Sequence, residues 1–224
     1  MSRFVLCILS VSNVSYHDAV FAARAAIGSG ALALLALVAV HLLKRDLDPS
    51  RTMISRYALG PYGWLMALCF AAWAAASLFL FGALTVLGTS TLGRIGLILL
   101  LVAGISLVLA AVFPMDPVGT PRTAISLSGK MHGLAFSIGL PCLVVAPLIL
   151  SLTVGTQASH AELPLVFLTA AIWLGLIVMI AIGVRVGPDH GPNPHVPRLF
   201  GWANRLLMVA YGVWLMVAAW PLAH

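Results

Sequence analysis

The chain has 224 residues, of which 62% are hydrophobic and only 8% are charged. Soluble domains average about 25% charged residues, so this composition excludes a soluble globular protein. The net charge of +6 comes from twelve Lys and Arg residues spread over the connections rather than gathered on one face, which argues against a nucleic-acid-binding surface.

The first 18 residues contain one short apolar run, Phe4–Val11, behind Arg3. A run of this length is too short to cross a bilayer, because a spanning helix needs about 20 apolar residues. We expect residues 1–18 to form a short interfacial or leader segment.

Six longer apolar segments follow, each long enough to cross about 30 Å of hydrocarbon as a helix. Backbone polar groups in lipid must be paired within the segment, so we expect helices. The predicted fold is an all-α integral membrane protein, with a transmembrane domain over residues 19–224. Its bundle of six transmembrane helices is expected at about 19–43, 62–87, 95–113, 131–153, 163–184 and 200–222.

Basic residues are distributed unequally between the two sides of this bundle. Three lie on the side of the first helix start: Arg3, Arg24 and Arg94. Nine lie on the other side: Lys44, Arg45, Arg51, Arg56, Arg122, Lys130, Arg185, Arg198 and Arg205. By the positive-inside rule, this distribution predicts a multi-pass protein of the cytoplasmic (inner) membrane with both termini outside.

The connection 113–132, FPMDPVGTPRTAISLSGKMH, holds Asp116 and His132 at the ends of two neighbouring helices. A carboxylate beside an imidazole can orient a general base, so His132 and Asp116 are our candidate catalytic pair. Ser126 and Ser128 lie between them and are candidate nucleophiles. The alternative is structural: Asp116 forms a turn before Pro117, and His132 is an interfacial residue.

Two further polar groups flank the helices on the same side. Ser55, Arg56 and Tyr57 precede the second helix, while Asn204 and Arg205 open the sixth. A guanidinium binds phosphate in a bidentate manner, so we expect these five residues to form a ligand-binding cluster. For Arg56 the alternative is simple membrane anchoring.

Metal and cofactor signals are weak. The connection 188–205 contains His190 and His195, whose spacing matches no established zinc pattern, so we predict no metal site. His41, paired with His132, is a candidate haem ligand. The cofactor otherwise stays unknown.

Four motifs carry a family resemblance: SRYALGPYGWLM at the second helix, FPMDP closing the third, GKMHGLAF opening the fourth and GWANRL opening the sixth. They resemble the prokaryotic membrane proteins grouped as domain of unknown function 998, over nearly the whole chain after residue 20. This resemblance implies six helices and no established reaction. A more distant likeness is to six-helix proteins of the Frag1/DRAM type.

Our leading functional hypothesis is binding of a membrane lipid headgroup by the polar cluster, with hydrolase or acyl-transfer chemistry at His132 as an extension. The first alternative is a non-catalytic accessory or assembly subunit, in which the same residues tie helices together. The second alternative is a haem-binding electron-transfer protein. The expected partners are lipid and a membrane-protein partner or a second copy of the chain, but not nucleic acid.

Overall fold

The computed structural model describes residues 16–86, 90–154, 162–186 and 197–224. Six long helices are present in these ranges: α2 (Tyr16–Leu43), α3 (Gly63–Leu84), α4 (Thr91–Val112), α5 (Leu127–Val154), α6 (Glu162–Val186) and α7 (Leu199–Ala219). Each is long and apolar enough to cross a membrane, which confirms the predicted class and the predicted six helices. Three short 3-10 helices accompany them: η1 (Ile54–Ala58), η2 (Arg122–Ala124) and η4 (Trp220–Leu222).

Two helices begin four residues earlier than predicted, because a serine caps each of them. The Ser90 side chain accepts a hydrogen bond from the Gly93 N–H (3.2 Å) at the start of α4. The Ser126 hydroxyl accepts one from the Gly129 N–H (3.0 Å) at the start of α5. Caps of this kind satisfy the orphan N–H groups of a first turn. A hydropathy window misses them because the residues involved are polar.

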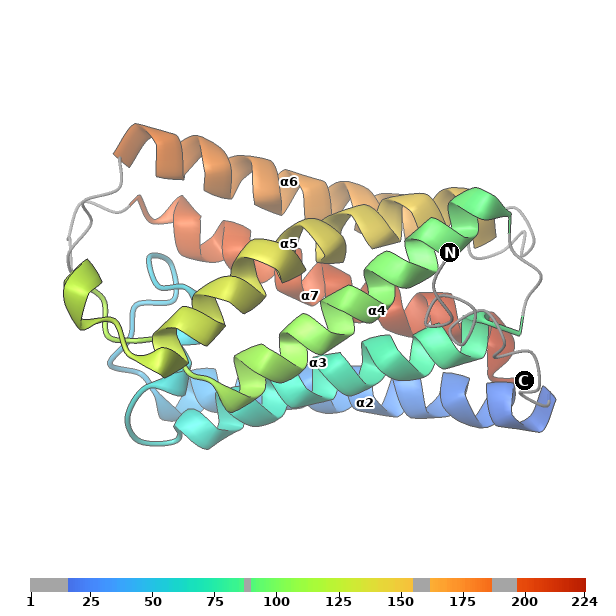
Figure 1. Cartoon of the computed structure of the whole chain (residues 1–224), viewed down its shortest axis with the longest axis horizontal. Helices are drawn as coiled ribbons and strands as arrows, with labels where there is room; N and C mark the ends of the chain where they lie inside the picture. The colour runs from blue at the N-terminus through green and yellow to red at the C-terminus, as the bar shows by residue number, and fades with distance from the viewer. Residues whose placement is uncertain (1–15, 87–89, 155–161, 187–196) are drawn as a thin grey trace.

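Neighbouring helices run in opposite directions and pack in an open bundle (Figure 1). The most extensive contacts join α2 to α3, α4 to α5 and α6 to α7, while α3 also packs on α4 and α2 on α7. The connections 44–62 and 113–126 therefore lie at the same end, together with the start of α7 (Figure 1). We call this the loop-rich end. The nine basic residues counted above lie in or beside its connections; the orientation in the membrane stays a prediction.

Several polar groups inside the bundle are paired with one another across helices. The hydroxyls of Ser77 and Tyr211 are 2.8 Å apart and join α3 to α7. The Trp214 indole N–H donates to the Ser151 hydroxyl (2.9 Å), which lies 3.0 Å from the hydroxyl of Thr169. Unpaired polar groups are costly in an apolar interior, so these pairs fix the relative positions of α5, α6 and α7.

Candidate functional site

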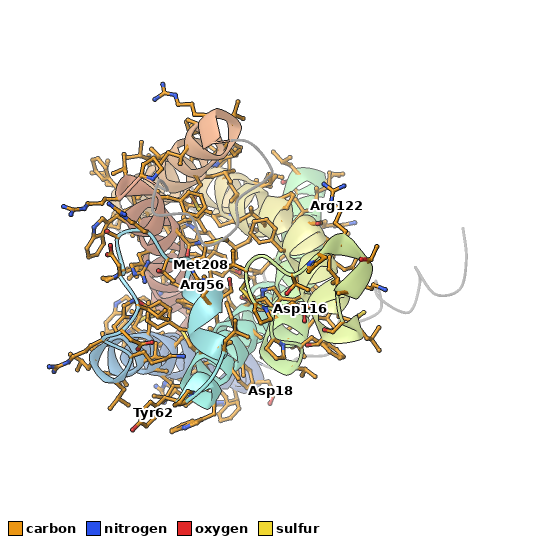
Figure 2. All side chains as sticks on the ribbon, turned by 90° about the vertical axis from the view of Figure 1, so that its left-hand side faces the viewer. Asp18, Arg56, Tyr62, Asp116, Arg122 and Met208 are labelled. Carbon is orange, nitrogen blue, oxygen red and sulfur yellow. The ribbon has the colours of Figure 1, made fainter. Side chains whose placement is uncertain are left out.

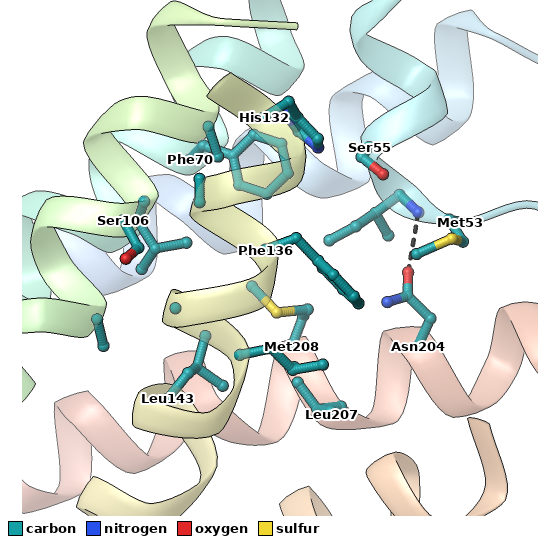
Figure 3. Close-up of a pocket in the computed structure, with 17 residues that line it drawn as sticks. Met53, Ser55, Phe70, Ser106, His132, Phe136, Leu143, Asn204, Leu207 and Met208 are labelled. Atoms are coloured by element: carbon teal, nitrogen blue, oxygen red, sulfur yellow. Dashed lines mark hydrogen bonds between the residues drawn. The ribbon is translucent and has the colours of Figure 1, made fainter. Parts of the chain in front are cut away.

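A cavity of about 80 Å³ lies inside the bundle toward the loop-rich end (Figure 3). Its walls come from α3, α4, α5, α7 and the segment around η1, and most of the lining side chains are apolar. Four polar residues interrupt this lining: Ser55, Ser106, His132 and Asn204. An apolar cavity with a few polar groups is the usual form of a small-molecule site.

An open groove of about 320 Å³ lies beside the cavity at the loop-rich end. Four residues line both spaces: Met53, Ser55, His132 and Phe136. The groove adds backbone and polar side chains from the connection 115–120, including Asp116. The cavity and the groove therefore adjoin at these four shared residues, which we call the mouth of the cavity.

His132 is held at this mouth by a backbone group. Its Nδ1 lies 2.9 Å from the Phe113 carbonyl oxygen. A carbonyl only accepts hydrogen bonds, so Nδ1 carries the proton, and in the neutral ring Nε2 keeps its lone pair. The ring also meets Phe70 edge-on, with 6.3 Å between ring centroids. His132 is thus a positioned acceptor, and the Phe113 carbonyl, not Asp116, orients it.

Asp116 instead fixes the start of α5. Its two carboxylate oxygens accept hydrogen bonds from the Ser126 N–H (2.8 Å) and the Ser126 hydroxyl (2.7 Å). The Ser128 hydroxyl donates to the Pro114 carbonyl (2.7 Å). Both candidate nucleophiles are therefore engaged in local capping. The structure places Asp116 and His132 on one groove but gives Asp116 the capping role; a catalytic role for either residue stays a prediction.

Arg205 makes four hydrogen bonds, all to neutral groups. Its Nε donates to His41 Nε2 (2.8 Å), Nη1 to the carbonyls of Thr52 (2.7 Å) and Gly201 (2.9 Å), and Nη2 to the Tyr57 hydroxyl (3.1 Å). The side chain is 7% exposed. The guanidinium of Arg205 is therefore hydrogen-bonded within the protein, and it joins α2, α7 and the connection 44–62.

Neighbouring residues of α7 bind the same connection. The Asn204 side-chain oxygen accepts from the Ile54 N–H (2.9 Å), and the Gly201 N–H donates to the Ser50 carbonyl (2.7 Å). A Cβ on Gly201 would stand 2.2 Å from the Pro49 carbonyl oxygen, so only glycine permits this approach. We call Gly201, Asn204 and Arg205, with the segment 49–54 that they hold, the α7 clasp.

Lys44 secures the other end of the same connection. It is buried, and its Nζ donates to the carbonyls of Tyr57 (3.2 Å) and Leu59 at the end of η1. Burial also raises the pKa of Tyr57 above its ordinary value. The predicted ligand-binding cluster is thus divided: Tyr57, Asn204 and Arg205 belong to the clasp region, with Asn204 also lining the cavity, whereas Ser55 faces the cavity and Arg56 lines another groove.

His41 has both ring nitrogens engaged. Nε2 accepts from Arg205, so Nδ1 carries the proton and donates to the Leu37 carbonyl (2.6 Å). The ring stacks on Tyr57 with 4.5 Å between centroids. No nitrogen is left for iron in this arrangement, which argues against the haem hypothesis. His190 and His195 lie outside the described residues. Within residues 16–86, 90–154, 162–186 and 197–224, no cluster of His, Cys, Asp or Glu can hold a metal.

Arg56 differs from Arg205 because its side chain has no hydrogen bond or ion pair with any described residue. It is half-buried and lines a second open groove of about 590 Å³, together with Lys44, Asp46 and Tyr62. Pro117 lines both this groove and the first one. Figure 2 looks onto the loop-rich end and shows Arg56 and Asp116 near its centre, with Arg122 at the rim.

Sequence reasoning missed the apolar part of this site. Phe136 and Ala110 line the cavity without any signal that separates them from lipid-facing residues. Ser106 did carry a signal, because it is a lone hydroxyl inside the apolar segment 95–113. A polar residue at membrane depth marks a packed or functional position.

One comparison with known proteins identifies a family, and none gives an activity. A family model described as "Protein of unknown function (DUF998)" matches residues 27–221, which confirms the resemblance inferred from the four motifs. No curated protein and no solved structure matches the chain.

Proposed function

We propose that this chain, which belongs to the DUF998 family of multi-pass membrane proteins, binds an anionic lipid at its loop-rich end. A segment of the lipid's apolar chain lies in the cavity between α3, α4, α5 and α7. The headgroup lies over the groove that carries Ser55, Asp116 and His132, and its phosphate binds Arg56.

The observation that supports this proposal is that the two spaces adjoin. An apolar cavity inside the bundle and a mainly apolar groove outside it, which also carries Asp116 and Thr120, share the residues Met53, Ser55, His132 and Phe136. A lipid likewise joins an apolar chain to a polar head, and in this proposal the head meets the few polar residues of the groove. Phe136 is 45% exposed and lines both spaces, so an apolar wall continues from the cavity to the surface.

The charge of the loop-rich end favours an anionic headgroup. The described residues there include nine basic side chains but only three acids: Asp46, Asp48 and Asp116. Arg205 and Lys44 already donate hydrogen bonds to backbone carbonyls. In Arg56, all the side-chain donors are available to a ligand. A guanidinium matches phosphate in geometry and charge. Arg56 is therefore the phosphate ligand in this proposal.

Filling the cavity tests the proposal directly. Ala110 lines the cavity and is only half-buried, so Ala110→Leu adds volume there without burying a polar group. We expect the variant to retain at least tenfold less anionic phospholipid in native mass spectrometry from mild detergent. Ala71→Leu is the matched control, because Ala71 is exposed on α3 and does not line the cavity. Equal lipid retention by both variants would rule out the cavity as the binding site.

Removing the charge of Arg56 tests whether this residue binds the lipid headgroup. In Arg56→Gln we expect the preference for phosphatidylglycerol over phosphatidylcholine to fall by about tenfold, the effect of one charge-assisted hydrogen bond. Arg122→Gln is the control, since Arg122 is exposed at the rim. An unchanged preference in Arg56→Gln would remove this residue from the site.

The accessory-subunit hypothesis is supported by a different observation, namely the α7 clasp, in which polar residues tie helices to a connection. The two proposals differ in what purifies with the protein. A partner chain without retained lipid would favour the accessory role.

A further inference from the structure

We infer that the lipid is a single-chain acyl ester with a free hydroxyl group, of the lysophospholipid class, and that Ser55 and His132 bind its ester carbonyl and hydroxyl. This inference rests on the proposed function and specifies its ligand.

The size of the cavity sets the number of chains. A cavity of about 150 Å³ in a protein core accommodates a ligand the size of benzene. The cavity here measures about 80 Å³. The part within the bundle therefore has room for a short segment of one chain, and the rest of that chain extends through the open side. The second chain of a diacyl lipid would have to remain outside the site.

Ser55 supplies an unused donor at the mouth of the cavity. It is 8% exposed, and its hydroxyl makes no hydrogen bond with any described residue. The hydroxyl oxygen itself is not fully enclosed and lines the cavity and the groove, so it can take a partner from either space. Three other serines of the loop-rich end, Ser50, Ser126 and Ser128, all have paired hydroxyls. Ser55 is thus the hydroxyl whose partner has to come from a ligand or from water.

His132 supplies an unused acceptor at the same mouth. Its Nδ1–H is committed to the Phe113 carbonyl, which leaves the Nε2 lone pair without a partner among the described residues. Ser55 and His132 both line the cavity and the groove, and Figure 3 shows them at the same end of the cavity. The mouth therefore offers one donor and one acceptor at the same end of the cavity.

A lysophospholipid matches this pair of groups. Its glycerol backbone carries an ester carbonyl, which accepts from Ser55, and on the adjacent carbon a free hydroxyl, which donates to His132 Nε2. A diacyl lipid has no free hydroxyl at that position. An alkyl ether lipid with one chain keeps the hydroxyl but lacks the carbonyl. These two lipids separate the contributions of His132 and Ser55.

The experiment is a competition measured by native mass spectrometry on the full chain in mild detergent. The probes, at equal concentration, are 1-palmitoyl lysophosphatidylglycerol, its 1-O-hexadecyl ether counterpart and dipalmitoyl phosphatidylglycerol. We expect the lyso ester to be retained about threefold to tenfold more than the ether, the range for one hydrogen bond. Ser55→Ala should reduce this ratio to about one.

The matched control is Ser137→Ala. Ser137 lies on α5, is exposed, and donates to the Gly133 carbonyl (2.8 Å), outside the cavity lining. It should leave the ester-to-ether ratio unchanged. Ser55→Ala should melt at the native temperature, because the hydroxyl that it removes has no partner in the described protein.

The outcomes separate the two proposals. Equal retention of ester and ether, or retention of the diacyl lipid equal to that of the lyso lipid, overturns this inference and leaves lipid binding standing. Retention of no lipid at all contradicts the proposed function and this inference with it.

Discussion

Two polar regions lie at the same end of this molecule, and they are built in opposite ways. In the α7 clasp, nearly every donor and acceptor has a partner within the protein: Arg205 alone makes four hydrogen bonds. At the mouth of the cavity, the Ser55 hydroxyl and His132 Nε2 have no hydrogen-bond partner among the described residues. Paired buried groups hold a structure together, whereas positioned groups without partners are available to a ligand. The predictions below test this division.

The largest effect is expected at the centre of the clasp. Arg205→Met should lower the free energy of unfolding by about 3 kcal/mol or more, because it leaves several buried acceptors unpaired at about 1–3 kcal/mol each. The measurement is equilibrium unfolding in detergent. Arg122→Met, at an exposed position, should stay within about 0.5 kcal/mol of the native protein. If both variants were equally stable, the clasp would not hold the fold.

The close approach of α7 to the connection is tested at Gly201. Gly201→Ala should lose about 2 kcal/mol, a typical cost of overpacking, because its Cβ would stand 2.2 Å from the Pro49 carbonyl oxygen. Gly28→Ala is the matched control on α2, where a Cβ meets nothing within 4 Å. That change should stabilise the protein by up to about 1 kcal/mol, since alanine favours a helix. Thermal melting of the two variants in opposite directions is the expected result.

Two buried serines sharpen the comparison within the bundle. Ser77 is paired with Tyr211, whereas Ser106 lines the cavity and its hydroxyl has no partner among the described residues. Ser77→Ala should cost about 1 kcal/mol, the net value of one hydrogen bond. Ser106→Ala should cost nothing measurable. Equal losses in thermal melting would mean that Ser106 is as fully paired as Ser77.

The smallest effect is a pH dependence at the connection that the clasp holds. The Ser50 hydroxyl and backbone N–H donate to Asp48 and hold the pKa of its carboxyl below the ordinary value. The carboxylate is therefore favoured in the folded state. Its contribution is complete above the unfolded pKa of about 4 and is lost as pH falls through the lower folded pKa. Melting temperature should fall slightly below about pH 4, and Asp48→Asn should remove that dependence.

The sequence by itself determined the fold class, the family and the six helices, because lipid imposes a length and an apolar composition on every spanning segment. It also singled out most of the polar residues that matter, including Arg205, His132 and Asp116. The helix starts were displaced by up to four residues, since serine caps such as Ser90 and Ser126 lie outside the apolar pattern.

Only the tertiary structure decided which of these residues are already paired. The acceptors of Arg205 come from its own helix, from Thr52 and Tyr57, and from His41, more than 140 residues earlier in the chain. The orienting group for His132 is a backbone carbonyl, which has no signature in sequence. The cavity itself arises where four helices and η1 fail to fill the space between them. Hydropathy fixes how a segment lies in lipid, but hydrogen-bond partners depend on which distant segments fold side by side.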